Sequence, residues 1–513
     1  MTKRILSLVL VLCLLPLTGC SEWDDRTEDD AFQTLMEYYK PVDEDKDKVS
    51  PLTGFALPYF EGHTMDPITC PDGPHQVLGA LLYQGLFALD PQFNPQPSLA
   101  QSWDYNSKTF TYTIRLRSDV KFSDGSTLTA DDVTATLRRA QNSARYGARF
   151  RDVESIYGYG DTVEITLKRG NAAFVALLDI PIVKAGTEDE SVPLGTGPYV
   201  PRKKDGKRYL RTNKYWTGDK LPLKRIDLVR CKDADTMSYA FYAREVQLLV
   251  YDLTANVSSN VYGTGSYTDA ATTTMHYIGM NTHREPLNDP KLRRALGLGI
   301  DRSGCVSAYL LGHGSAAQFP LSPSSALYPE KMDVPYSPDN FDTAMKKAGF
   351  TKGKDIPLEL LVNQENQTKV DAAKKIAADL SRHDVKISVT VLPWDEYLSA
   401  LRNGRFDLYY GECRLGADWN LRPLLSPGGN LNYGGYSSKQ TTQLVDRLLT
   451  APEAKREAAA QALCKNLSTQ APILPICFEN ISVLLPSGAV KKITPTAANP
   501  FYDFSSWKIN MEK

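Results

Sequence analysis

Cys20 carries a thiol at the end of an N-terminal leader, where a side chain can be modified after export. The leader opens with two cations, continues through an apolar stretch over residues 5–15, and ends on small residues: Lys3, Arg4, Thr18 and Gly19. This combination predicts a secretory signal. The apolar stretch is too short to span a bilayer, because a spanning helix needs about 20 apolar residues.

The last four residues of the leader, Leu17-Thr18-Gly19-Cys20, resemble the lipobox of bacterial lipoproteins. The resemblance implies cleavage before Cys20 and a diacylglycerol on its thiol. The alternative is an ordinary secretory signal whose cysteine is accidental. We expect residues 1–19 to be a lipoprotein signal peptide and the mature chain to be anchored outside the cytoplasm.

The remaining cysteines and the histidines show no metal-ligand spacing. Six cysteines follow Cys20, none in a CxxC pair: Cys70, Cys231, Cys305, Cys413, Cys464 and Cys477. They could pair in an oxidising compartment or remain as buried free thiols. The histidines are scattered and avoid residues 405–435: His63, His75, His276, His283, His313 and His383. We therefore expect no metal site and no cofactor.

Motifs of hydrolases are missing from the chain. There is no G-x-S-x-G elbow, no H-E-x-x-H and no S-x-x-K block with its partners. Gly312-His313-Gly314-Ser315 comes closest to a nucleophile turn but lacks the trailing glycine. A secreted peptidase is therefore disfavoured, and we expect a binding protein rather than an enzyme.

Length and composition indicate a large globular protein. The chain has 513 residues, of which 42% are apolar and 23% are charged, with a formal net charge of −1. This length predicts two or three domains. Because no broad basic field exists, we expect no nucleic-acid partner. After Cys20 the chain has no apolar stretch long enough to cross a membrane.

Local patterns predict a mixture of helices and strands. Alternation predicts a strand over residues 110–116, and Thr129 with two following aspartates predicts a helix start. Asp289-Pro290 predicts another helix, continuing through Ile300 and stopping at Gly304. Residues 358–362, 370–380 and 385–391 read as strand, helix and strand, which indicates a βαβ unit. A further helix is expected from Pro452 to about Leu467.

The segment over residues 21–48 is polar and acidic. Such a composition favours an extended tether, because it buries too little apolar surface to fold alone. A short helix around residues 31–39 is compatible with that reading. We assign residues 20–50 to an acidic tether.

Four blocks of the sequence are specific enough to name a family. They are SLAQSWDYNSKTFTYTIRLRSDVKFSDGSTLTADDVTAT (98–136), PLGTGPY (193–199), YIGMNTHREPLNDPKLRRALGLGIDRS (277–303) and RFDLYYGECRLGADW (405–419). In order and spacing they resemble the extracytoplasmic solute-binding proteins of peptide and nickel ABC importers. This family includes the oligopeptide- and dipeptide-binding proteins. The resemblance runs from about Thr64 to Trp507.

The resemblance implies an α/β, two-lobed periplasmic-binding-protein fold with the ligand cleft between the lobes. The first lobe would cover residues 51–276 and include an inserted small subdomain at about 88–190. The second lobe would cover residues 277–485, and residues 486–513 would return to the first. The crossings between the lobes are expected near Tyr277–Asn281 and 479–485.

The resemblance also implies ligand-binding residues. A peptide presents an α-amine, for which a buried carboxylate is the natural partner. In Ala417-Asp418-Trp419, similar to the family's ADY-like motif, Asp418 would bind this amine; otherwise it caps a turn. Trp419 and Trp394 would supply aromatic walls, or else belong to the core. Gly195, Thr196 and Gly197 would approach the ligand, or else form a tight turn.

The chain departs from the family pattern beside this motif. Peptide-binding members often carry an arginine before the aspartate to receive a carboxylate. Arg414 is the nearest here, closer than the family spacing suggests, and Arg405 is another candidate. Where the family continues with a second acid, this chain has Arg422. The ligand class is therefore less determined than the fold.

These observations predict a monomeric, lipid-anchored receptor that captures a small solute, most simply an oligopeptide or dipeptide. It would deliver the solute to the permease of an ABC transporter. A sensor for a signalling peptide is the alternative. The nickel complexes, sugars and opine-like compounds bound within this family remain open as ligands.

Overall fold

The computed structural model describes residues 51–252, 265–350, 356–381 and 385–512. The expected signal peptide, the Cys20 modification site and the tether lie outside these residues. The chain divides into two units, residues 1–46 and 47–513, and the fold below is that of the second. Within its described residues, every helix is too short or too polar to cross a membrane.

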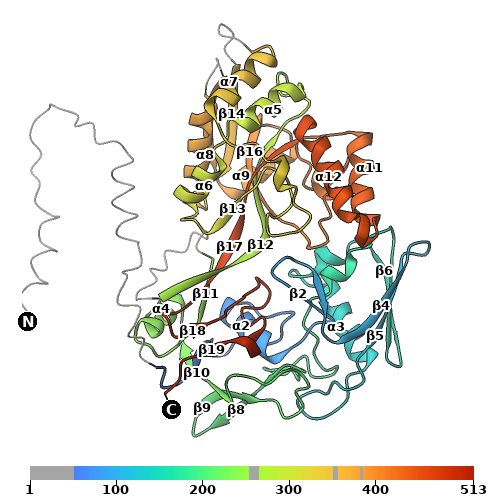
Figure 1. The fold of residues 1–513 in the computed structure, drawn as a ribbon, viewed down its shortest axis with the longest axis vertical. Helices are drawn as coiled ribbons and strands as arrows, with labels where there is room; N and C mark the ends of the chain where they lie inside the picture. The colour runs from blue at the N-terminus through green and yellow to red at the C-terminus, as the bar shows by residue number, and fades with distance from the viewer. Residues whose placement is uncertain (1–50, 253–264, 351–355, 382–384, 513) are drawn as a thin grey trace, which may run out of the picture. The chain divides into compact units, whose positions relative to one another are not determined.

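A four-stranded sheet forms the base of the lower group of elements in Figure 1. Its strand order is β1 (Ala56–Phe60), β10 (Arg225–Cys231), β9 (Lys207–Thr212) and β8 (Tyr199–Lys204). Helices α2 (Gly73–Leu82) and α4 (Ala234–Tyr242) lie in the same group, as does the C-terminal pair β18 (Val490–Lys491) and β19 (Lys508–Ile509). Leu52 pairs with Met511, so the first and last described residues meet at this end.

A second four-stranded sheet, with its own core, completes the lower group. Its order is β4 (Ala100–Asn106), β5 (Thr111–Leu116), β7 (Thr162–Leu167) and β6 (Val153–Tyr159). Helix α3 (Ala130–Gln141) packs on it and begins with a capping box between Thr129 and Asp132. The strand and the helix start predicted from the sequence are both confirmed. The short hairpin of β2 (Phe87–Leu89) and β3 (Pro95–Pro97) adjoins this sheet.

A seven-stranded sheet organises the upper group. Its order is β11 (Leu249–Tyr251), β17 (Ile473–Pro486), β12 (Gly265–Met280), β16 (Leu408–Arg414), β14 (Ile356–Asn363) and β15 (Val385–Leu392), with β13 (Gly314–Ala316) paired to β17. The accompanying helices are α5 (Pro290–Leu298), α6 (Arg302–Tyr309), α7 (Pro338–Lys347), α8 (Gln367–Leu380), α9 (Trp394–Arg402), α10 (Arg422–Leu425), α11 (Lys439–Thr450) and α12 (Glu453–Gln470).

The predicted βαβ unit is confirmed, because β14 and β15 pair in parallel across α8. The helix predicted from Pro452 is confirmed as α12. The helix after Asp289 was predicted too long. It ends at Leu298, and Asp301 then caps a separate helix by accepting a hydrogen bond from Gly304 N. A second capping side chain twelve residues after the first restarts the helix in a new direction.

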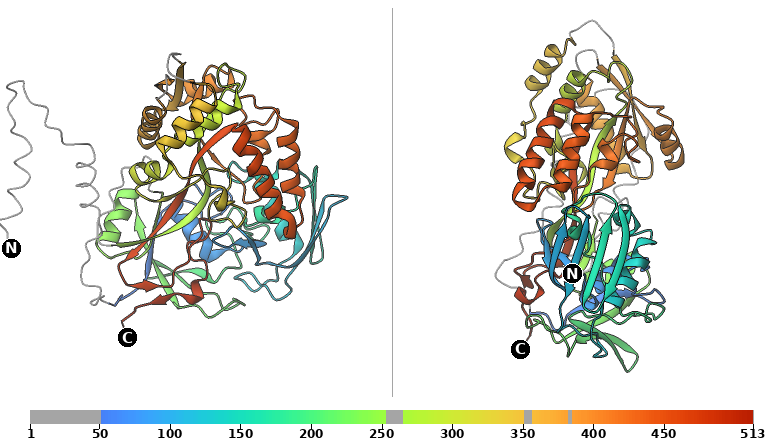
Figure 2. Two further views of the ribbon diagram at one scale, coloured as in Figure 1. Left: turned by 45° about the horizontal axis from the view of Figure 1, so that its top comes forward. Right: turned by 90° about the vertical axis from the view of Figure 1, so that its right-hand side faces the viewer.

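The long strands β12 and β17 run between the upper and lower groups in both views of Figure 2. The α/β, two-lobed fold expected from the resemblance is therefore confirmed. The exact lobe boundaries, 51–276, 277–485 and 486–513 with a subdomain at 88–190, stay predictions. We use "lower lobe" and "upper lobe" for the two groups of elements that these strands connect.

Candidate functional site

A cavity of about 1520 Å³ lies where the two lobes face each other. The lower lobe contributes residues near α2, the loop after β2 and the segment 145–181. The upper lobe contributes the end of β16 and the following residues 415–431, and β12 supplies residues 271–274. The cavity exceeds the roughly 300–1,000 Å³ typical of small-molecule pockets. It is therefore large enough for an extended solute such as a peptide.

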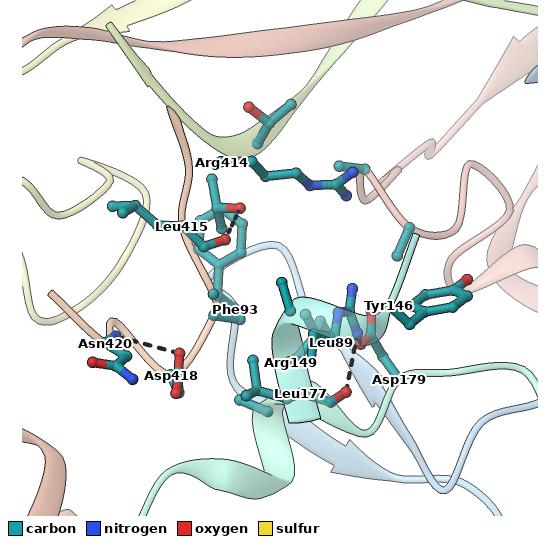
Figure 3. A pocket seen from close by; sticks show the side chains of 18 of the residues that line it. Leu89, Phe93, Tyr146, Arg149, Leu177, Asp179, Arg414, Leu415, Asp418 and Asn420 are labelled. Carbon is teal, nitrogen blue, oxygen red and sulfur yellow. Dashed lines mark hydrogen bonds and ion pairs between the residues drawn. The ribbon is translucent and has the colours of Figure 1, made fainter. Parts of the chain in front are cut away.

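Arg414 ends strand β16 and extends into this cavity (Figure 3). Among the described residues, its guanidinium has neither an ion-pair partner nor a hydrogen-bond acceptor. Burial lowers the pKa of Arg414, and the positive charge of Arg149 lowers it further. An unpaired cation whose side chain is exposed at a cavity wall is suited to receive an anionic group of a ligand.

Arg149 reaches the same part of the cavity from the lower lobe, but it is already neutralised (Figure 3). Its guanidinium forms an ion pair with Asp179 and donates a hydrogen bond to the backbone oxygen of Leu177 at 3.0 Å. These bonds hold Arg149 in place. Of these two arginines, Arg414 is the one whose charge has no ion-pair partner among the described residues.

Asp418 lines the cavity from the upper lobe and is only 1% exposed. Its Oδ2 accepts a hydrogen bond from Asn171 Nδ2 at 2.8 Å, and its Oδ1 accepts one from the backbone N–H of Asn420 at 3.3 Å. Burial raises the pKa of Asp418, against these hydrogen bonds and the charge of Arg456. A carboxylate oxygen has two lone pairs, so each can still accept a hydrogen bond from a ligand amine.

The two predicted aromatic residues are not among the residues that line this cavity. Trp419 is 2% exposed and packs edge-on against Phe93 and Phe478 in the core. Trp394 begins α9, is 48% exposed and stacks on Tyr397. Their roles in ligand binding stay predictions that this geometry does not favour. The aromatic rings on the cavity wall are those of Phe93, Tyr146 and Phe174.

The glycine turn is also packed against protein rather than placed on this cavity wall. A Cβ on Gly195 would lie 2.2 Å from the backbone oxygen of Leu82, and one on Gly197 would lie 2.4 Å from its carbonyl carbon. The buried Thr196 lies between them. The geometry favours the alternative reading, a tight turn that lets two backbones approach closely.

Replacing Gly197 with alanine is expected to destabilise the fold by roughly 1–3 kcal/mol, because the new methyl group meets backbone atoms that cannot rotate away. Thermal unfolding would measure this effect. Gly54→Ala is the matched control, since a Cβ there meets nothing within 4 Å. A ligand affinity that falls while stability stays unchanged would instead point to a ligand contact.

Sequence reasoning missed the lower-lobe half of the site. Arg149 and Asn171 come from the segment that faces the upper lobe, and the backbone N–H of Ala172 donates to Leu449 O at 2.7 Å. Arg151 also donates to Asn430 Oδ1 at 2.8 Å. The available signal was a run of three arginines between aromatic residues, at positions 145–151.

Two groups of side chains in the described residues have donor atoms close enough to hold a metal ion. In the first, His63 and His75 flank Asp72, but His75 Nε2 accepts the backbone N–H of Phe60 at 3.2 Å. The neutral ring then carries its proton on Nδ1, the atom that would have to bind the metal. This tautomer disfavours a metal at His75.

The second group lies on neighbouring strands of the seven-stranded sheet. His276 is register partner to Glu412, and its Nε2 lies 2.5 Å from Glu479 Oε1. Glu412 forms an ion pair with Lys369. Burial would raise the pKa of Glu412, but the charges of Lys369 and His276 outweigh it and the pKa lies below its ordinary value. These side chains satisfy one another's charges, although linear spacing did not reveal the cluster.

Comparison with protein families gives one match over most of the folded chain. Residues 94–430 match the model described as bacterial extracellular solute-binding proteins, family 5 Middle. Among curated proteins, the glutathione-binding protein GsiB of Escherichia coli O6:K15:H31 (strain 536 / UPEC) is 27% identical over 450 residues. The alignment covers 82% of this chain and 87% of GsiB.

Solved structures share the fold at lower sequence identity. A nickel ABC transporter protein from Bacillus halodurans has a TM-score of 0.74 at 20% identity, covering 88% of this chain and 98% of that one. The murein tripeptide-binding protein MppA, in an unliganded open form, has a TM-score of 0.74 at 18% identity, covering 90% and 98%. The oligopeptide-binding protein AppA from Bacillus subtilis, in complex with a nonapeptide, has a TM-score of 0.59 at 21% identity, covering 90% and 100%.

Proposed function

We propose, because the chain belongs to the bacterial extracellular solute-binding proteins of family 5, that it is a receptor for a peptide or a peptide-like solute. It would be anchored by a lipid at Cys20, hold the solute between its two lobes and deliver it to an ABC transporter permease. The proposal includes a monomeric receptor without enzymatic activity. The proposed ligand carries both an amine and a carboxylate.

The choice of ligand rests on one observation: residues of opposite charge line the same large cavity. Arg414 offers an unpaired guanidinium and Asp418 a desolvated carboxylate, and both line the space between the lobes. A zwitterion complements this pair, since each end gains a charge-assisted hydrogen bond. The family relatives named for glutathione and for peptides bind solutes of this kind.

The cavity favours an organic solute over a nickel complex. Among the residues that line it in the described structure, His75 is the one histidine. The ring of His75 accepts a backbone N–H at Nε2, as described above. A nickel complex would find few soft or imidazole ligands here, whereas charged and polar groups are abundant.

Native mass spectrometry of the purified chain tests the proposal, because solute-binding proteins can retain a solute from the host. We expect a bound mass in the range of small peptides. Titration calorimetry with glutathione, trialanine, a nickel–histidine complex and a neutral disaccharide then separates the ligand classes. Binding of the sugar or the nickel complex in preference to both peptides would contradict the proposed ligand.

Replacing Cys20 with serine is expected to move the protein out of the membrane fraction. Serine cannot form the thioether that would carry the lipid, and the remaining apolar leader is too short for a stable span. Cell fractionation with radiolabelled palmitate measures both location and acylation. Cys13→Ser, within the leader, is the control and should leave both unchanged. A Cys20→Ser protein that stays membrane-bound and is still cut before residue 20 would contradict lipid anchoring.

A further inference from the structure

The hairpin formed by β8 and β9 concentrates positive charge at the lower end of the molecule (Figure 1). Residues 202–225 contain ten lysines and arginines and two aspartates, in a chain whose net charge is −1. Most of these cations are exposed, among them Arg202, Lys203, Lys204, Lys207, Arg211, Lys214 and Lys224. The hairpin therefore presents a local positive field that the whole chain does not have.

The hairpin places like charges directly opposite each other. Lys203 faces Arg208, and Lys204 faces Lys207 across the two-residue turn. Directly opposed like charges destabilise a strand pair. The turn itself needs only Asp205-Gly206, whose φ values of 49° and 77° suit a tight hairpin. Folding alone gives no reason for these lysines.

The hairpin tip stays positive, because Asp205 in the turn is one acid among the three lysines of the tip. Lys203, Lys204 and Lys207 form no ion pair among the described residues, whereas Arg225, farther along the sheet, pairs with Asp227. Lysines on an edge strand can serve to block aggregation. That role fits β8, which is the edge, but not the cations of β9, which lies between β8 and β10.

We propose that the β8–β9 hairpin binds the anionic surface of a phospholipid membrane. The hairpin belongs to the same four-stranded sheet as β1, the first strand of the described chain, and Leu52, four residues before β1, pairs with Met511. Tyr215 and Trp216, both half-buried, follow the hairpin and suit an interface between water and lipid. The inference rests on the proposed function only for its setting outside the cytoplasm.

The physical consequence is a second, electrostatic contact beside the proposed lipid. The diacylglycerol expected at Cys20 has two acyl chains and would hold the protein at the membrane, and the basic patch would add a contact made by the folded domain itself. This contact would also limit how freely the folded domain rotates at the membrane. The receptor would then rest on the membrane with the sheet of β1, β10, β9 and β8 toward the lipid.

Vesicle co-sedimentation tests the surface without any lipid on the protein. The chain from Ser21 onward is suitable, since residues 47–513 form a compact unit by themselves. We expect it to bind phosphatidylglycerol vesicles at low salt, to bind phosphatidylcholine vesicles far less, and to be released as salt screens the charges. Each cation near the surface contributes about fivefold, so Lys203→Gln/Lys204→Gln/Lys207→Gln should lose at least tenfold in affinity.

The control replaces three exposed lysines of the upper lobe, Lys331, Lys346 and Lys347, with glutamine. It has the same net charge as the hairpin variant and should bind vesicles like the unmodified chain. Equal loss in both variants, or equal binding to both lipids, would overturn the proposal. Tighter binding to a DNA fragment at equal phosphate concentration would assign the surface to nucleic acid instead. Peptide affinity should be unchanged in both variants. A negative result with vesicles would therefore contradict membrane binding without contradicting the proposed peptide ligand.

Discussion

Arg414→Gln is expected to weaken the binding of a free peptide by roughly 30-fold or more. The guanidinium is unpaired among the described residues and is exposed to the cavity, so a ligand carboxylate would be its principal counter-charge once a ligand excludes water. Removing one partner of a desolvated charge pair costs about 2–5 kcal/mol. The stability of the unliganded protein should change little, because the Arg414 side chain is exposed and makes no ion pair among the described residues.

Calorimetry on a two-by-two set decides this prediction. The tightest peptide from the panel above is compared with its C-terminal amide, on the unmodified chain and on Arg414→Gln. The amide should bind the unmodified chain about as weakly as the acid binds the variant, and the variant should not distinguish them. Equal affinity of acid and amide for the unmodified chain would remove Arg414 as the carboxylate partner.

Two further variants test whether the effect depends on the shape of the guanidinium and on its position in the cavity. Arg414→Lys keeps the charge but loses the planar fork, so it should restore part of the affinity. Arg169→Gln is the matched control on the same cavity. Arg169 lines the cavity but already pairs with Asp152, so its charge is compensated and its loss should cost little ligand affinity.

Asp418→Asn is expected to lower the affinity for peptides with a free amine by a similar factor. The neutral amide keeps the size of the side chain but offers no counter-charge to an ammonium group in a water-poor site. N-acetylated peptides should bind the unmodified chain weakly and should be nearly indifferent to the substitution. Equal binding of free and acetylated peptides by the unmodified chain would assign the amine to another group.

Asp418 should also make both folding stability and peptide affinity depend on pH. Burial raises the pKa of Asp418 in the folded protein, so ionised Asp418 opposes folding, and this residue's contribution to stability falls as pH rises through that pKa. Ligand binding has the opposite sign, because an ammonium group requires the ionised form. Peptide affinity should therefore fall as pH drops through the raised pKa, and Asp418→Asn should remove that part of the pH profile. Calorimetry at several pH values measures it.

Local patterns in the sequence were reliable where the deciding interactions are themselves local. The alternation of β5, the cap at Thr129 and the βαβ unit around α8 all depend on neighbours within a few residues or on a period of two or 3.6. The one misjudged helix also had a local cause. Asp301 is a second capping residue, and the predicted helix continued past it instead of ending before it.

The sequence by itself predicted the family and the α/β class, and it named Arg414 and Asp418 among the candidate ligand-binding residues. Tertiary structure alone decided what surrounds them. Asn171 reaches Asp418 across 247 positions in sequence, and Arg149 comes from the opposite lobe. The same packing turned the neighbouring Trp419 into the core, and not onto the cavity wall. A sequence shows which charged residues exist. Their burial and their interaction partners arise only when distant segments pack together. Burial and partners then decide whether a charged group can bind a ligand.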